Sequence, residues 1–160
     1  MGKDSWSFSE KDFNSLSDSL RRFLDESGSH CALLVDRSGQ LITTIGEKPD
    51  FDTTAFASLT AADFSANDQL ARLIGENDFS SLFHQGERES MYLAGVAGRL
   101  ILVALFDNRT TLGMVRLRTK QAVEELTSIC ERMLADAGRG APSASGILAG
   151  ADDEIDQLFK

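Results

Sequence analysis

The chain has 160 residues, of which 42% are hydrophobic and 26% are charged, a composition typical of one globular domain with short tails. Its 16 basic and 25 acidic residues give a net charge of -9, and the basic residues form no run. Such a surface repels phosphate groups, so we expect neither nucleic acid nor a membrane surface as a partner.

Two cysteines, Cys31 and Cys130, lie far apart in apolar sequence, and the first residues (MGKDSWSFSEK) lack the apolar segment of a signal peptide. We therefore predict a reducing, cytoplasmic location without a disulfide. Cys31 follows His30, but neither His30 nor His84 has further ligands at metal-binding spacing. No metal or other cofactor is predicted.

Four segments are expected: an N-terminal extension at 1–8, a folded domain at 9–137, a flexible linker at 138–151 and a short acidic segment at 152–160. The domain begins with a helix predicted over 9–26, with Ser9 as its N-cap and Gly28 at its end. Its apolar residues recur at three- and four-residue steps, namely Phe13, Leu16, Leu20, Phe23 and Leu24.

A hairpin follows at residues 30–47, HCALLVDRSGQLITTIGE. The continuous apolar run CALLV predicts a strand covered on both faces, and LITTI is rich in β-branched residues. Between them, Asp36 can bond its own backbone and Gly39 can adopt a positive φ. Turn chemistry therefore accounts for Asp36, and we interpret it as the hinge of a hairpin rather than a catalytic residue.

A second helix is predicted over 51–75, with apolar residues Phe56, Leu59, Leu70, Leu73 and Ile74. Between Leu59 and Leu70 this stripe continues through smaller or aromatic residues, Ala61, Ala62, Phe64 and Ala66. Such a stripe is too apolar for a solvated face, so another surface should cover it. Nearby acids, Asp63, Asp68 and Asp78, are attributed to capping and solubility.

Strands predicted at 78–84, 90–95 and 99–106 are joined by short turns and form an antiparallel meander. A third helix is predicted over 112–135. The sequence contains no phosphate-binding GxxxxGK[ST] loop, no GxSxG turn and no HExxH, and GVAG at 95–98 fits a hairpin turn better than a dinucleotide loop. A non-enzymatic protein is therefore expected.

Three stretches resemble the Roadblock/dynein light chain family: SGSHCALLVDRSGQLITTIG, LTAADFSANDQLARLIGE and TTLGMVRLRTKQAVEEL, in register over about residues 9–136. The resemblance implies an α+β, Roadblock/profilin-like fold in the order α-β-β-α-β-β-β-α, with a five-stranded antiparallel sheet flanked by three helices. It also implies a homodimer formed by the second helix and the neighbouring strand. MglB-like bacterial members dimerise and stimulate GTP hydrolysis by a Ras-like GTPase of the MglA type.

The leading hypothesis is thus a cytoplasmic homodimeric scaffold that regulates a small GTPase. The predicted dimer interface comprises Phe56, Leu59, Ala62, Ala66 and Leu70. The predicted GTPase-binding surface is the exposed edge of the same helix, with Thr60, Asp63, Asn67 and Arg72. Candidates for an arginine finger are Arg72 and Arg88, but neither is expected in an exposed, glycine-flanked loop, which favours positioning of the GTPase's own residues.

The alternative hypothesis is an interaction adaptor in a chemosensory, flagellar or cell-polarity complex without a GTPase. The segment DDEIDQLFK at 152–160 places Ile155, Leu158 and Phe159 on one helical face after a Gly, Ser and Ala-rich linker. We expect it to dock on a groove of a partner, either a receiver-like domain or the GTPase complex.

Overall fold

The computed structural model describes residues 9–139, and its elements follow the predicted order α-β-β-α-β-β-β-α. The elements are α1 (Glu10–Ser27), β1 (Cys31–Asp36), β2 (Leu41–Gly46), α2 (Thr53–Leu73), β3 (Ser81–Gln85), β4 (Ser90–Val96), β5 (Leu100–Phe106) and α3 (Leu112–Arg139). The five strands form one antiparallel sheet in the order β2-β1-β5-β4-β3. The predicted α+β fold is confirmed, whereas the extension at 1–8, most of the linker and the segment at 152–160 lie outside the described residues.

Local chemistry sets the ends of α1 as the sequence predicts. The Ser9 hydroxyl accepts a hydrogen bond from the Asp12 backbone N–H at 3.1 Å. At the other end Gly28 has a φ of 76°, and its N–H donates to the Leu24 carbonyl. A Cβ at Gly28 would approach the Thr110 Cβ to 2.9 Å, so a side chain at this position would be disfavoured by both backbone and space.

The segment between β1 and β2 forms a tight hairpin turn, as its sequence indicates. The Asp36 carboxylate accepts from the Ser38 N–H at 2.6 Å, and the Gly39 N–H donates to the Asp36 carbonyl at 2.9 Å. Gly39 has a φ of 100°. Asp36 is therefore used by the turn itself.

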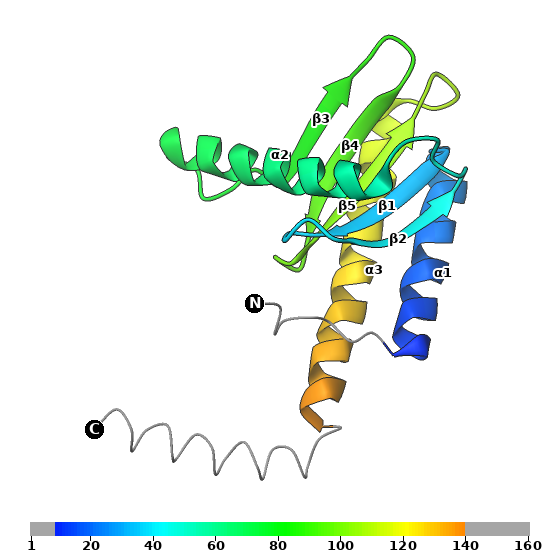
Figure 1. Cartoon of the computed structure of the whole chain (residues 1–160), viewed down its shortest axis with the longest axis vertical. Coiled ribbons are helices and arrows are strands. Elements are labelled where there is room, and N and C mark those ends of the chain that lie inside the picture. The colour runs from blue at the N-terminus through cyan, green and yellow to red at the C-terminus, as the bar shows by residue number, and fades with distance from the viewer. Residues whose placement is uncertain (1–8, 140–160) are drawn as a thin grey trace.

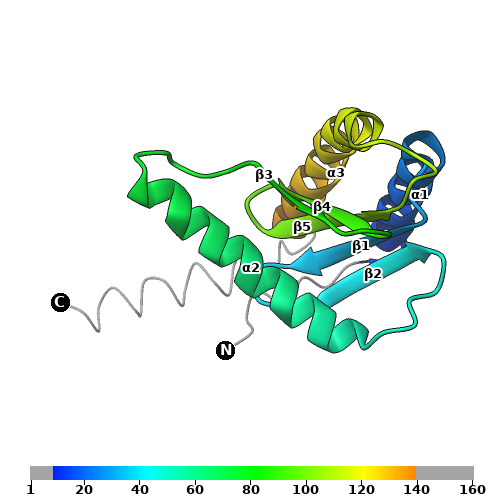
Figure 2. The same cartoon turned by 90° about the horizontal axis from the view of Figure 1, so that it is seen from above.

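Helices cover the two faces of the sheet unequally. α1 and α3 lie side by side on one face, and α2 alone crosses the other (Figures 1 and 2). In β1, Ala32 and Leu34 belong to the core beneath α1 and α3, whereas Leu33 and Val35 belong to the core beneath α2. All four are fully buried, which confirms that this strand is covered on both faces. Within residues 9–139, no helix has both the length and the apolar character needed to cross a bilayer.

Phe64 is the largest fully buried side chain of α2 and belongs to the core between this helix and the sheet. Its side chain is 1% exposed, and a Cβ built on Gly95 of β4 would lie 3.4 Å from its ring, an ordinary contact distance. The aromatic ring therefore packs directly on β4 at Gly95.

Phe64→Ala should reduce the free energy of unfolding by about 3–5 kcal/mol, because it leaves a cavity between α2 and the sheet. Urea unfolding at fixed protein concentration measures this loss. Phe51→Ala is the matched control: Phe51 is 40% exposed, and its loss should cost less than about 1 kcal/mol. Equal losses in the two variants would show that Phe64 does not anchor α2.

Candidate functional site: the outer face of α2

α2 begins at a capped end and packs one of its faces on the sheet. The Asp52 carboxylate accepts from the backbone N–H groups of Thr54 and Ala55 at 3.0 and 3.1 Å. The residues buried along the helix recur at three- and four-residue steps, as a face turned toward the sheet requires. They are Ala57, Thr60, Ala61, Phe64, Asn67, Asp68 and Ala71.

A partly buried ion pair also fixes this inner face. Arg37, in the β1–β2 turn, donates to the Asp68 carboxylate at 2.9 Å, and its guanidinium lies 5.0 Å from the centre of the Phe64 ring. The sequence-based interpretation of Asp68 as a residue for capping and solubility is therefore wrong. Asp68 joins α2 to the turn, through a partner that lies far away in the chain.

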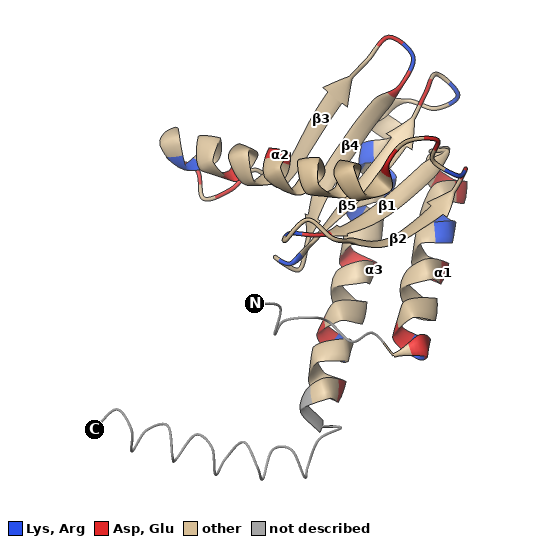
Figure 3. Ribbon diagram, viewed as in Figure 1, with Lys and Arg blue, Asp and Glu red and all other residues tan. Residues whose placement is uncertain are grey.

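The outer face of α2 is apolar and uncovered. Leu59, Leu70, Leu73 and Ile74 are 69%, 57%, 82% and 71% exposed, the highest values among the large hydrophobic residues that the structure describes. Ala62 and Ala66 are exposed between them. We call the row Leu59, Ala62, Ala66, Leu70 and Leu73, with Ile74 after it, the outer stripe. Figure 3 shows that α2 carries few charged residues over most of its length.

Strand β3 provides a second unpaired surface beside this helix. It lies at the edge of the sheet and pairs only with β4 among residues 9–139. His84 on β3 contacts the Asp63 carboxylate on α2 at 2.6 Å, which links the strand to the helix. An open strand edge can pair with a strand of another chain, so α2 and β3 together offer a docking surface.

The residues of the predicted dimer interface do not all lie on one face of α2. Leu59, Ala62, Ala66 and Leu70 of the predicted dimer interface lie on the outer stripe, whereas Phe56 is half-buried, with its ring 4.9 Å from that of Phe51. Ala61 and Phe64 belong to the inner face, so the single stripe predicted from the sequence is in fact two faces.

The predicted GTPase-binding edge also needs correction. Thr60 and Asn67 are only 3% and 7% exposed because they lie on the inner face, so their placement on an exposed edge is wrong. Arg72 is exposed and the Asp63 side chain is 37% exposed, on the flanks of the helix. The residues of the tail prediction, Ile155, Leu158 and Phe159, lie outside the described residues.

A charged cluster lies at the end of the sheet where β1 begins. His30 contacts Glu89 at 2.6 Å and Glu47 at 3.5 Å, and ligand atoms of His30, Glu89 and Asp107 lie within 4.8 Å of one another. Both carboxylate oxygens of Asp107 accept hydrogen bonds from the Arg109 guanidinium. A bound cation would compete with that guanidinium, so we interpret the cluster as an ion-pair network.

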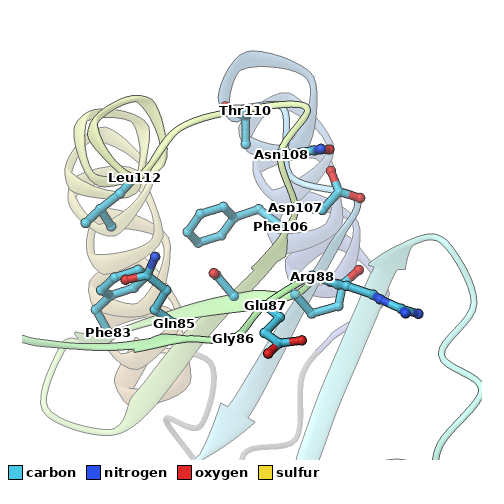
Figure 4. A pocket seen from close by; sticks show the side chains of 12 residues that line it. Phe83, Gln85, Gly86, Glu87, Arg88, Phe106, Asp107, Asn108, Thr110 and Leu112 are labelled. Carbon is cyan, nitrogen blue, oxygen red and sulfur yellow. The ribbon is translucent and has the colours of Figure 1, made fainter.

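A recess of about 490 Å³ opens between the β3–β4 hairpin and the β5–α3 loop (Figure 4). Phe83, Phe106 and Leu112 form its apolar part, and the rings of Phe83 and Phe106 stack with centroids 6.1 Å apart. Arg88 extends away from these three side chains. It is exposed in the hairpin, two residues after Gly86, so the expectation that it lacks an exposed loop near glycine is wrong.

Comparison with known proteins identifies the class of this fold. The model of the Roadblock/LC7 domain matches residues 16–106, and the chain belongs to this family. The comparison with curated proteins gives no match.

Among solved structures, the chain is similar to Myxococcus xanthus MglB, with 44% identity over 78% of this chain and 94% of that one and a TM-score of 0.74. It is also similar to the gliding protein MglB from Thermus thermophilus, with 32% identity, coverage of 80% and 97%, and a TM-score of 0.74. A further structure, described as MglB with tetrameric arrangement, shows 33% identity, coverage of 81% and 97%, and the same TM-score.

Arg109→Ala should raise the pKa of Asp107. Hydrogen bonds from the Arg109 side chain, and then from its backbone N–H, lower that pKa from 3.8 to about 2. Because the folded-state pKa is the lower one, the ion pair stabilises the fold above about pH 4, and this contribution is lost as the pH falls through about 2. Titration of the Asp107 carboxyl carbon by NMR measures the shift, and Arg88→Ala, which leaves the pair intact, is the control. An unchanged Asp107 titration in Arg109→Ala would contradict the assignment.

Proposed function

We propose that the chain is a non-enzymatic scaffold that forms a homodimer through the outer stripe and the β3 edge. The dimer binds a Ras-like small GTPase and stimulates its GTP hydrolysis. The observation that carries this proposal is the outer stripe, since the most exposed large hydrophobic residues of residues 9–139 are gathered on the one helix that covers its sheet face alone. The similarity to MglB structures supports it.

A second copy of the chain is the partner that fits the stripe best. In a two-fold symmetric dimer the same stripe is buried twice, and each fully buried leucine or isoleucine contributes about 1.5–3 kcal/mol. Leu59, Leu70, Leu73 and Ile74 from both copies thus supply up to about 12–24 kcal/mol, against an association cost of about 4–15 kcal/mol. The small side chains of Ala62 and Ala66 allow two helices to approach closely. The structure described as MglB with tetrameric arrangement also supports self-association.

A Ras-like GTPase is the partner that the Roadblock resemblance implies. Asp63 is engaged by His84 at the β3 edge, within the proposed dimer interface. Arg72 of α2 and Arg88 in the β3–β4 hairpin are exposed, and we expect the dimer to leave both accessible to a partner. A scaffold can stimulate hydrolysis by inserting an arginine or by holding the switch residues of the GTPase in place. We favour holding, because Arg72 lies within a regular helix that fixes its backbone. Arg88, exposed in the β3–β4 hairpin near Gly86, is the candidate for insertion and is tested below.

Ala66→Glu should convert the dimer into a monomer, because a charge at the centre of a close helix contact loses its hydration without gaining a partner. Light scattering should give twice 17.4 kDa for the wild type and 17.4 kDa for the variant at tens of micromolar. Ser65→Glu is the matched control: it adds the same charge on an exposed position of α2 about 100° around the helix, and the dimer should persist. A monomeric wild type would refute the dimer.

Arg72→Ala should weaken binding of an MglA-type GTPase loaded with a GTP analogue, while the rate of hydrolysis at saturation stays within about tenfold of wild type. Arg88→Ala should behave in the same way. Single-turnover GTP hydrolysis and titration by fluorescence anisotropy separate rate from affinity. A loss of about 10³ in rate with binding intact, in either variant, would show an arginine finger instead.

A further inference from the structure

A groove of about 660 Å³ runs along α3, on the face of the sheet opposite to α2. Tyr92 and Ala94 of β4 form one wall, and Leu117 and Val123 of α3 form part of the other. α3 lies over β4, but no helix among residues 9–139 lies beyond it over β3 on this face (Figure 2). Leu117 is therefore 52% exposed although it lies beside core residues.

The rim of this groove is basic in a chain with a net charge of -9. Arg116 and Lys120 lie on α3, one helical turn apart, and both are exposed. Neither has an ion-pair partner among residues 9–139, although Glu124 lies along the same groove. An apolar groove with a basic rim is complementary to a peptide that combines acidic residues with large apolar side chains.

We propose that residues 152–160 of the same chain bind in this groove. The segment DDEIDQLFK has four acids within its first five residues, and these complement Arg116 and Lys120. Ile155, Leu158 and Phe159 follow three- and four-residue spacing, so in a helix they would lie on one face and could cover Leu117 and its apolar neighbours. Elsewhere on an acidic surface the same segment would be repelled.

The chain is long enough to make this contact. α3 ends at Arg139, and Arg116 lies 23 residues earlier, about 35 Å back along the helix. The 13 residues from 139 to 152 span up to about 43 Å when extended. The first acids can therefore reach the basic rim of their own subunit.

Binding of residues 152–160 to their own subunit does not require a GTPase. Residues 152–160 cannot occupy this groove and the groove of a partner, as predicted from the sequence, at the same time. Any partner of residues 152–160 would then have to compete with Arg116 and Lys120. The groove and the outer stripe lie on opposite faces of the sheet, so both can be occupied at once.

The test uses the full chain with a nitroxide on Lys160→Cys. The reagent should select this cysteine, because Cys31 and Cys130 are at most 2% exposed and burial raises the pKa of both thiols. In ¹⁵N-labelled protein, the amide signals of Gly113 and Leu117 should lose intensity, while those of Thr54 and Ala55 on α2 keep it. Equal loss at all four amides would overturn the proposal.

A charge reversal then tests the rim. Arg116→Glu with Lys120→Glu should restore the groove signals, whereas Arg21→Glu with Lys48→Glu, the same charge change at exposed sites elsewhere, should not. Signal loss that survives the first pair of substitutions, or that disappears equally with the second, would contradict the assigned site. A mixture of spin-labelled chains without ¹⁵N and ¹⁵N chains without a spin label shows which subunit supplies the segment. Signal loss at the groove of the ¹⁵N chains would show that a second copy supplies it.

Discussion

One helix has to cover a whole face of a five-stranded sheet, and the rest of this structure follows from how α2 does so. Its inner face is held by the Phe64 ring against Gly95 and by the ion pair between Arg37 and Asp68. On the other face of the sheet α1 and α3 lie side by side, and each helix buries part of the other's surface. α2 has no such neighbour among residues 9–139, so its apolar outer stripe lies open, and a second chain is the natural cover.

Much of this architecture could be predicted from the sequence, because local chemistry determines it. Ser9, Gly28 and Gly39 mark ends and turns through backbone interactions that need only near neighbours in the chain, and each has the role that was predicted. The apolar run of β1 likewise implied a strand covered on both faces. These signals do not depend on how distant elements pack.

The division of α2 into two faces could not be predicted in the same way. A helix that carries apolar residues on two opposite faces has no sharp periodicity, so Ala61 and Ala62 look alike although only one is buried. Thr60 and Asn67 are polar and were assigned to solvent, yet tertiary packing buries them. The Arg37–Asp68 pair joins residues 31 positions apart and leaves no local pattern.

The arrangement suits a protein that acts by contact. Within residues 9–139 the side chains of His30, Glu89 and Asp107 form a cluster that could hold a metal ion, but Asp107 is engaged by Arg109. In contrast, two opposite faces of the sheet carry uncovered apolar surface, one on α2 and one beside α3. A scaffold of this kind can join a second copy with one face and bind a peptide with the other.

The central claim is that the outer faces of two α2 helices meet, and the distance between them tests it most directly. A nitroxide on Gln69→Cys, an exposed position at the side of the outer stripe, reports this distance by double electron–electron resonance, because the native cysteines are buried. Two helices in contact have axes about 8–10 Å apart, so the account predicts one narrow, short distance distribution between subunits. A dimer that gives no short distance between these labels would place the interface elsewhere and contradict the account.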